Sequence, residues 1–311
     1  MKRRRRAAAW VLLAGLVLSA CQPTRPTGPS PAEPTATALA AIEPTPTHAP
    51  AGTDRIAALQ ESSTDMLGFH ESSLAYRAVI DAGARVVNVR ELGTFFVLWT
   101  PYGYTSREER PVMLLVHGSD DDAYSMTAAR MGRADNHGYA LVAVQWWLGE
   151  DRYLAPEVVY RLISTAMDYV GRTDGADIHN AAYEGFGQGA AIAYQIAYSD
   201  RVLGSDYFSL FICHSGGMHE SGSPFIENAQ AGSLGNDVFK GQHFYMYCGM
   251  MDEQWGATMC EYMRNAEHTV TKYGGTVDRF IRDPHGSHGG FLKNDVYYED
   301  AIATWFELAT P

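Results

Sequence analysis

Three stretches of the chain could together carry out nucleophilic catalysis: a glycine-rich turn, an acidic turn and a loop with two histidines. The glycine-rich turn spans 185–189 and reads Gly-Phe-Gly-Gln-Gly. An apolar run leads into it and a small-residue helix leads out, an arrangement that presents the central residue of the turn to substrate. That residue would supply the attacking group. Here it is Gly187, which has no side chain to attack with.

The other two stretches offer an acid and a base. Asp252 and Glu253 follow a predicted strand over 243–248, and His285 and His288 lie in a glycine-rich loop after the last predicted strand. Histidine suits proton transfer because its unperturbed pKa of about 6.5 lets it exchange protons near neutrality. An acid beside it would hold its tautomer and stabilise the imidazolium. The residue types alone leave both choices open.

An alternation of apolar runs and helical stretches indicates the fold that would position these residues. Uninterrupted apolar runs are typical of strands buried on both faces of a parallel sheet. A hairpin is expected first, over 84–89 and 94–100. The later strands are expected over 111–116, 139–145, 176–184, 207–213, 243–248 and 276–281, and the helices over 123–133, 156–171, 190–198, 257–273 and 293–308. The sequence therefore predicts an α/β fold with a mostly parallel central sheet, an N-terminal hairpin and helices on both faces.

The first 20 residues are predicted to be an export signal that is not part of the fold. A basic cluster precedes an apolar stretch over 7–18, which is shorter than the roughly 20 residues that span a bilayer. The sequence Leu-Ser-Ala-Cys at 18–21 resembles the lipobox of bacterial lipoproteins. By that resemblance Cys21 carries a lipid anchor, and Gln22 favours the outer membrane of the cell envelope, with the domain facing the periplasm or the surface. The alternative is an ordinary secretory signal with a chance cysteine.

Residues 21–53 are rich in Pro, Thr and Ala, and such a segment cannot bury enough surface to order itself. We expect it to act as a semi-extended tether and the folded domain to span 54–311. Without residues 1–20 the formal net charge changes from −12 to −17, because five basic residues and no acids are removed. A strongly acidic surface argues against nucleic acid as a partner.

Three cysteines follow Cys21, in a compartment that permits disulfides. An odd count leaves at least one thiol free. Cys213 and Cys248 both end apolar runs, which favours buried small hydrophobic side chains at both positions. A disulfide between Cys248 and Cys260 is the alternative. No Cys/His spacing in the chain is typical of zinc ligands, and we expect neither a metal nor a cofactor.

Four motifs, in this order, resemble the α/β-hydrolase superfamily over residues 84–308. They are a Val-His-Gly turn over 116–118 after a buried strand, the strand, turn and helix around 185–189, an Asp after a later strand, and a Gly-x-His near the end. The chain looks like a secreted esterase of the polyhydroxybutyrate-depolymerase and feruloyl-esterase type more than a lipase. The resemblance implies a nucleophile, an acid and a histidine in that chain order, with Gly187 in place of the serine.

The resemblance also implies a role for each candidate residue. Asp252 stands where the family has its acid. The Gly-x-His pattern selects His288 as the base, with His285 as the runner-up. The backbone N–H groups of Ser119 and Gln188 would form an oxyanion hole, in which each donor typically contributes about 10²–10³ in rate.

Other side chains near the expected site have weaker assignments. Trp146 and Trp147 follow a predicted strand at the edge where such sheets bind ligands, and they could line an acyl or aryl pocket. Ser119, Ser215 and Ser287 lie on loops near the site and are alternative nucleophiles. None of these serines lies on a strand-turn-helix bend.

The residues therefore support one main hypothesis and two alternatives. The main hypothesis is an envelope-anchored protein of the serine carboxylic-ester hydrolase type that is silent or strongly impaired at Gly187, and whose pocket still binds an ester or carboxylate ligand. Loss of the nucleophile costs roughly 10⁶ in turnover in such sites. The first alternative is an active hydrolase, in which His288 activates a water molecule or a serine outside the turn attacks. The second is a non-catalytic scaffold that displays its acidic surface or the segment 216–241 to a partner.

Overall fold

The structure is a computed structural model that describes residues 59–119, 121–218, 224–252 and 258–310. The predicted signal over 1–20, Cys21 and the tether to residue 53 lie outside the described residues, as does Glu253. Among the described residues, no helix combines the length and apolar character that crossing a bilayer requires.

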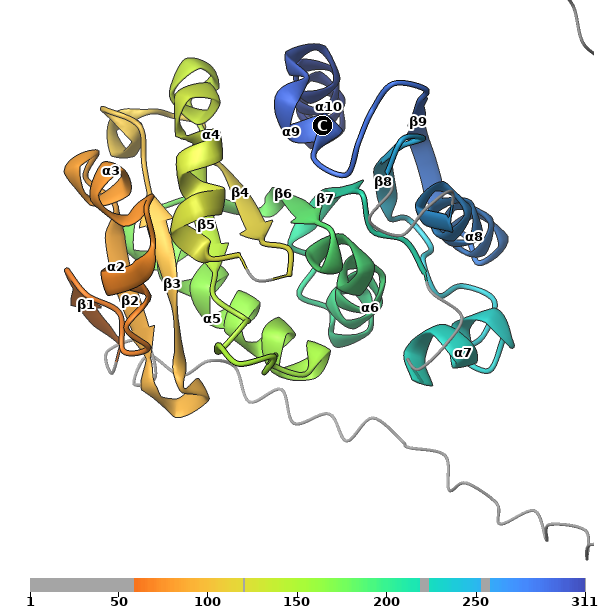
Figure 1. Cartoon of the computed structure of the whole chain (residues 1–311), viewed down its shortest axis with the longest axis horizontal. Coiled ribbons are helices and arrows are strands. Elements are labelled where there is room, and N and C mark those ends of the chain that lie inside the picture. The colour runs from red at the N-terminus through yellow and green to blue at the C-terminus, as the bar shows by residue number, and fades with distance from the viewer. Residues whose placement is uncertain (1–58, 120, 219–223, 253–257, 311) are drawn as a thin grey trace, which may run out of the picture. The chain divides into compact units, whose positions relative to one another are not determined.

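A nine-stranded sheet forms the centre of the domain (Figure 1). Its strands are β1 (Gln60–Ser62), β2 (Arg85–Val89), β3 (Thr94–Trp99), β4 (Pro111–Val116), β5 (Ala140–Val144), β6 (Asp177–Phe186), β7 (Phe208–His214), β8 (His243–Gly249) and β9 (Thr276–Asp283). They lie in the order β1-β2-β3-β5-β4-β6-β7-β8-β9. The pairs from β1 to β3 and the β3–β5 pair are antiparallel, and the remaining pairs are parallel. This confirms the predicted mostly parallel sheet with an N-terminal hairpin.

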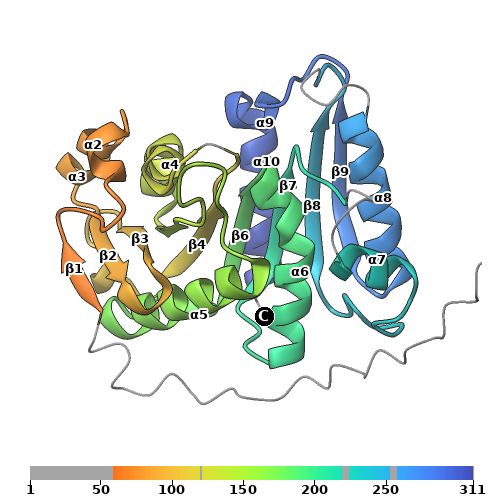
Figure 2. The same cartoon turned by 60° about the horizontal axis from the view of Figure 1, so that its bottom comes forward.

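Helices cover both faces of the sheet, as predicted (Figure 2). They are α2 (Phe69–Ser72), α3 (Tyr76–Asp81), α4 (Ala123–His137), α5 (Pro156–Thr173), α6 (Gln188–Leu203), α7 (Pro224–Gln230), α8 (Thr258–Lys272), α9 (Gly290–Lys293) and α10 (Asp295–Ala309), with short 3-10 turns at Arg90–Leu92 and Tyr104–Ser106. The helices α5, α6 and α8 share one hydrophobic cluster with the sheet, and α3, α4 and α10 share the other.

The strand β4 shows why an uninterrupted apolar run forms a central strand. Successive side chains of a strand point to opposite faces. Val112, Leu114 and Val116 belong to the cluster with α5 and α6, whereas Met113 and Leu115 belong to the cluster with α4 and α10. All five are fully buried. Because β4, β6, β8 and β9 are mutually parallel, the three stretches predicted to carry chemistry follow the carboxyl ends of strands at one edge of the sheet.

Three local features differ from the sequence prediction. Residues 60–62, ahead of the predicted hairpin, form an edge strand, β1, which pairs with β2. The segment 216–241 contains the helix α7. The last helix is divided into α9 and α10 at Asn294, whose side chain accepts a hydrogen bond from the N–H of Val296 at 3.0 Å and so caps α10.

The expectation for the cysteines was right for one residue and wrong for another. Cys213 is a buried free thiol in β7. Cys248, expected to be a buried small hydrophobe, instead forms a disulfide with Cys260 of α8. The pair is only 12 residues apart in the sequence, and a turn followed by a helix that packs back on β8 brings the two cysteines together.

Candidate functional site

Gly187 lies at the bend between β6 and α6, where the nucleophile position was predicted. Its φ is 55° and its ψ is −116°, a conformation that is strained for residues with a side chain. Its N–H donates to the carbonyl of His214, and its carbonyl accepts from the N–H of Ala191, both at 3.0 Å. The bend is therefore held by backbone hydrogen bonds that need no side chain at 187.

The glycines around Gly187 are required by close approaches of the backbone. A Cβ at Gly185 would lie 2.6 Å from the carbonyl oxygen of Gly189, and a Cβ at Gly189 would lie 2.1 Å from that of Val116. A Cβ at Gly216 would lie 1.8 Å from the carbonyl oxygen of Gly187. Position 187 differs, because the nearest described atom to a Cβ there is 3.3 Å away. A side chain at the centre of the turn would need only a small shift of the His288 ring, whereas at the flanking glycines it would collide with the backbone.

His288 and Asp252 form a hydrogen-bonded pair beside Gly187. Nδ1 of His288 lies 2.7 Å from Oδ2 of Asp252. The carboxylate is fully buried, whereas the His288 side chain is 23% exposed. An ideal Cβ on Gly187 would lie 3.3 Å from Nε2 of His288. The carboxylate therefore makes Nδ1 the donor, and Nε2 is turned as an acceptor toward the place where the hydroxyl of a nucleophile would stand.

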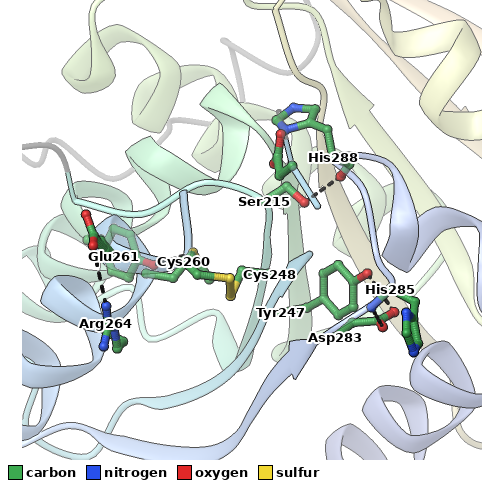
Figure 3. The surroundings of a disulfide bond; sticks show 12 residues. Ser215, Tyr247, Cys248, Cys260, Glu261, Arg264, Asp283, His285 and His288 are labelled. Carbon is green, nitrogen blue, oxygen red and sulfur yellow. Dashed lines mark hydrogen bonds and ion pairs between the residues drawn. A yellow bond between two sulfur atoms is a disulfide. The ribbon is translucent and has the colours of Figure 1, made fainter. Parts of the chain in front are cut away.

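The turn that carries Asp252 is docked on the loop that carries His288. The N–H of Met251 donates to the carbonyl of Gly286 at 2.9 Å, and the N–H of Met250 donates to the carbonyl of Asp283, at the end of β9, at 2.8 Å. The disulfide between β8 and α8 brackets the same turn (Figure 3). These links hold Asp252 and His288 together although the two residues follow different strands.

Ser215 lines the pocket beside Gly187 and is hydrogen-bonded to the loop that carries His288. Its hydroxyl donates to the carbonyl oxygen of His288 at 2.5 Å, as Figure 3 shows. The residue is fully buried and has a φ of 56°, which is unusual for a residue other than glycine. Such strain is typical of functional sites whose surroundings fix the backbone. The hydroxyl of Ser215 therefore positions the histidine loop.

The alternative base, His285, faces a different surface. It is exposed, and its N–H donates to Oδ1 of Asp283 at 3.0 Å. Figure 3 shows it beside Asp283 and Tyr247, away from His288. It lines a separate hollow, together with the alternative nucleophile Ser287. The structure therefore brings His288 to the glycine turn and leaves His285 outside.

The residues predicted to donate to an oxyanion, Ser119 and Gln188, line the pocket beside Gly187. Gln188 is the first residue of α6, so its N–H is among the helix amides that have no partner within the helix. Ser119 follows β4, and the adjacent Gly118 Cα lies 3.7 Å from an ideal Cβ on Gly187. Ser119 and Gln188 both line the same pocket as His288. Amides in this arrangement can stabilise negative charge that develops on a carbonyl oxygen.

This pocket has a volume of about 720 Å³, which is in the range of small-molecule sites. Neither Trp146 nor Trp147 is among the described residues that line it. Trp146 is buried against the ring of Tyr153, with centroids 4.8 Å apart, and Trp147 packs on Phe69 at 5.4 Å. Tyr153 lines the pocket where the tryptophans were expected.

A buried charged cluster next to the site was not predicted. Nε of Arg130, in α4, donates to both carboxylate oxygens of Glu184, in β6, at 2.9 and 3.0 Å. Nε2 of His214 donates to the same carboxylate at 3.0 Å. Burial alone would raise the pKa of Glu184, but Arg130 and His214 outweigh it and lower that pKa to about 2. The only sign of this cluster in the sequence is Glu184, a charged residue within an otherwise apolar stretch of β6.

One aromatic ring connects this cluster with the candidate base. Phe186 stacks on His214 with ring centroids 5.2 Å apart and an angle of 18° between the planes. On the other side its centroid lies 5.0 Å from that of His288. The cluster therefore fixes Phe186, and Phe186 packs against the His288 ring.

His117 of the predicted Val-His-Gly turn has a structural place. The ring is fully buried, and Nδ1 lies 2.9 Å from the Gly118 carbonyl oxygen. The indole N–H of Trp146 donates to the His117 carbonyl at 3.0 Å. Burial lowers the pKa of His117 to about 4, against the weaker opposing effect of its hydrogen bond to Gly118.

This pKa predicts a loss of stability in mild acid. Because the pKa of His117 is about 6.5 in the unfolded chain and about 4 in the fold, the unfolded state binds the extra proton between these values. The contribution of neutral His117 to the free energy of unfolding is therefore fully present above pH 6.5 and is lost as the pH drops toward 4. Between pH 7 and pH 5 the free energy of unfolding should fall by about 2 kcal/mol through this residue. Denaturant unfolding of His117→Asn should lack this part of the pH dependence; an unchanged dependence would contradict the assignment.

Comparisons with known proteins identify the fold. No protein-family model and no curated protein sequence matches the chain. Among solved structures, a fungal esterase from Rhizomucor miehei has a TM-score of 0.54 at 12% identity, over 78% of this chain and 89% of that one. A carbohydrate esterase from gut microbiota has a TM-score of 0.53 at 14% identity, over 70% and 91%. A putative dienelactone hydrolase from Klebsiella pneumoniae has a TM-score of 0.51 at 13% identity, over 70% and 92%. The chain has the α/β-hydrolase fold, and at these identities the similarity shows the fold alone.

Proposed function

We propose that this chain is a carboxylic-ester hydrolase-type protein that binds an ester or carboxylate ligand and turns it over slowly or not at all. The acid, the base and the oxyanion donors remain, while the attacking hydroxyl is absent because position 187 is glycine. The observation that supports this most strongly is that a Cβ on Gly187 would lie 3.3 Å from Nε2 of His288, while Nδ1 of the same ring is held by Asp252. That geometry serves a nucleophile that this chain lacks.

The remaining groups suit an oxygen that carries negative charge. The amides of Ser119 and Gln188 would donate to one oxygen of a carboxylate or to an ester carbonyl. His288 adds a donor when it is protonated. Loss of a serine nucleophile leaves about 10³–10⁴-fold catalysis over water, from the oxyanion hole and binding. We therefore expect the pocket to bind a carboxylate product and to hydrolyse an ester only slowly.

Steady-state and rapid-mixing kinetics with p-nitrophenyl acetate test this proposal. We expect turnover within about 10³–10⁴-fold of the uncatalysed rate and no stoichiometric burst of p-nitrophenol. Short-chain carboxylates should inhibit this residual activity and shift the imidazole resonances of His288 in NMR spectra. A stoichiometric burst would sink the proposal, because it would reveal a covalent acyl-enzyme and hence a working nucleophile.

A second candidate is a slow hydrolase in which His288 activates water. The short distance from the Cβ position of Gly187 to Nε2 of His288 favours this route. A water molecule hydrogen-bonded to Nε2 would occupy the place of the serine hydroxyl. Nε2 would take one proton as the water oxygen attacks the ester carbon. The amides would hold the oxyanion, and the alcohol would leave with that proton. This route predicts turnover that disappears in His288→Ala and shows no burst, whereas a silent site predicts no loss on that substitution.

We also propose that the protein is anchored to the cell envelope through a lipid on Cys21. The support is the basic and apolar leader and the lipobox-like sequence before this cysteine. In cell fractionation, Cys21→Ser should move the protein from the membrane fraction to the soluble fraction. As a control, Gln22→Asp should leave it membrane-bound. Retention of Cys21→Ser in the membrane fraction would exclude a lipid on this residue.

A further inference from the structure

One wall of the pocket carries a carboxylate that the proposed ester chemistry does not use. Asp151 and Tyr153 line the pocket and belong to a tight hairpin that follows β5. The hairpin is closed by a bridge between Trp147 and Tyr153 and by a hydrogen bond from the N–H of Leu148 to the carbonyl of Arg152 at 2.7 Å. These backbone links fix the conformation of the hairpin that carries Asp151 and Tyr153.

The sheet order places this hairpin across the pocket from the acid and the base. The strands run β5-β4-β6-β7-β8-β9, with the Gly187 bend at the end of β6. Asp151 enters the pocket from the β5 side. Asp252 and His288 follow β8 and β9 on the other side. A ligand whose carbonyl lies at the bend would therefore have His288 on one side and Asp151 on the other.

The described lining of the pocket carries one acidic side chain on this wall, Asp151, whereas the neighbouring Arg152 does not line the pocket and donates to the Leu148 carbonyl at 3.2 Å. Asp151 is exposed to the pocket and makes no ion pair with a described residue. No lysine or arginine occurs among the described lining residues, and the lining includes the rings of Tyr153 and Tyr262. A carboxylate and tyrosine rings that line one pocket form a combination that recognises alkylammonium groups, because ring faces attract cations and the carboxylate adds a full charge.

We infer that the ligand of this site carries an alkylammonium group, held by Asp151 and the Tyr153 ring, at a short distance from its ester or carboxylate group. Asp151 is then the residue that determines specificity for the positive charge. The inference rests on the proposed function, since it assumes that the carbonyl end binds at the Ser119 and Gln188 amides. A volume of about 720 Å³ is sufficient for a small ester with such a group.

A pair of probes of equal shape separates the charge from the rest of the ligand. Acetylcholine and 3,3-dimethylbutyl acetate differ only by the replacement of a quaternary nitrogen with carbon. Each is titrated into the full-length protein while the imidazole resonances of His288 are followed by NMR. We expect acetylcholine to bind about 10-fold more tightly, the preference that one partly exposed ion pair with an aromatic contact provides. The preference should shrink at high salt.

The chain offers a matched control for the decisive variant. Glu150 precedes Asp151, carries the same charge and has a similar backbone conformation (φ of 53° against 58°), but it does not line the pocket. Asp151→Asn should abolish the preference for acetylcholine, and Asn tolerates this conformation well. Glu150→Gln should retain it. Equal affinities for both probes in the unsubstituted protein, or a preference that survives Asp151→Asn, would overturn the inference while leaving the proposed function intact. If neither probe shifts His288, the proposed function itself fails.

Discussion

Replacement of Gly187 by serine is expected to raise the turnover of short-chain p-nitrophenyl esters by at least about 10³-fold. The reason is geometric. A side chain at 187 would start 3.3 Å from Nε2 of His288, whose other nitrogen is already held by Asp252. The proposed oxyanion donors are main-chain groups that the substitution does not alter. Comparison of kcat and KM for the two proteins measures the effect, which should appear in kcat.

This variant needs controls for folding and for the identity of the base. A serine at a φ of 55° should cost about 1–3 kcal/mol of stability, which a folded domain can tolerate. Gly187→Ser combined with His288→Ala should lose the gained activity, whereas Gly187→Ser combined with His285→Ala should keep it. A folded Gly187→Ser protein with unchanged turnover would show that the bend does not serve as a nucleophile elbow.

The second large effect is expected from the buried cluster beside the site. Arg130→Met should lower the free energy of unfolding by about 3–5 kcal/mol, because it leaves the Glu184 carboxylate buried without its main counter-charge. Glu184 is fully buried and accepts two hydrogen bonds from the Nε of Arg130. Methionine keeps much of the side-chain volume, so the change tests the charge more than the packing. Chemical denaturation at pH 7 measures it.

The same helix provides the control for this prediction. Arg133 lies one turn further along α4, with its side chain 22% exposed over the ring of Tyr298, and pairs with Asp295, which is 76% exposed and so leaves the ion pair open to solvent. Exposed ion pairs contribute about 0–1 kcal/mol. Arg133→Met should therefore change stability by less than about 1 kcal/mol. Equal effects of the two substitutions would mean that the Arg130–Glu184 pair contributes no more than a surface contact.

The sequence was informative where a local pattern determines the structure. The run before His117 predicted β4, because a strand that is covered on both faces is apolar at every position. The small residues around Gly187 predicted the bend, since Cβ atoms at Gly185 and Gly189 would collide with the backbone. Chain order and the Gly-x-His pattern then pointed to His288, which the structure places beside the bend.

Features that depend on distant partners could not be predicted. Arg130 and Glu184 are 54 residues apart and meet only because α4 packs on β4 and β5, next to β6 in the sheet. The disulfide at Cys248 depends on how α8 returns to β8. The aromatic wall was assigned to Trp146 and its neighbour, but the hairpin after β5 reverses the chain, so that Tyr153 lines the pocket. Sequence distance carries little information on such contacts.

The central claim is that a complete ester-hydrolase pocket surrounds a missing hydroxyl, and covalent labelling tests it most directly. A fluorophosphonate probe is incubated with the unsubstituted protein and with Gly187→Ser, and the adducts are located by peptide mass spectrometry. We predict no adduct on the unsubstituted protein and one stoichiometric adduct at position 187 of the variant, which disappears when His288 is also replaced. A stoichiometric adduct on Ser119, Ser215 or Ser287 of the unsubstituted protein would contradict the claim, as would a folded variant that remains unlabelled at 187.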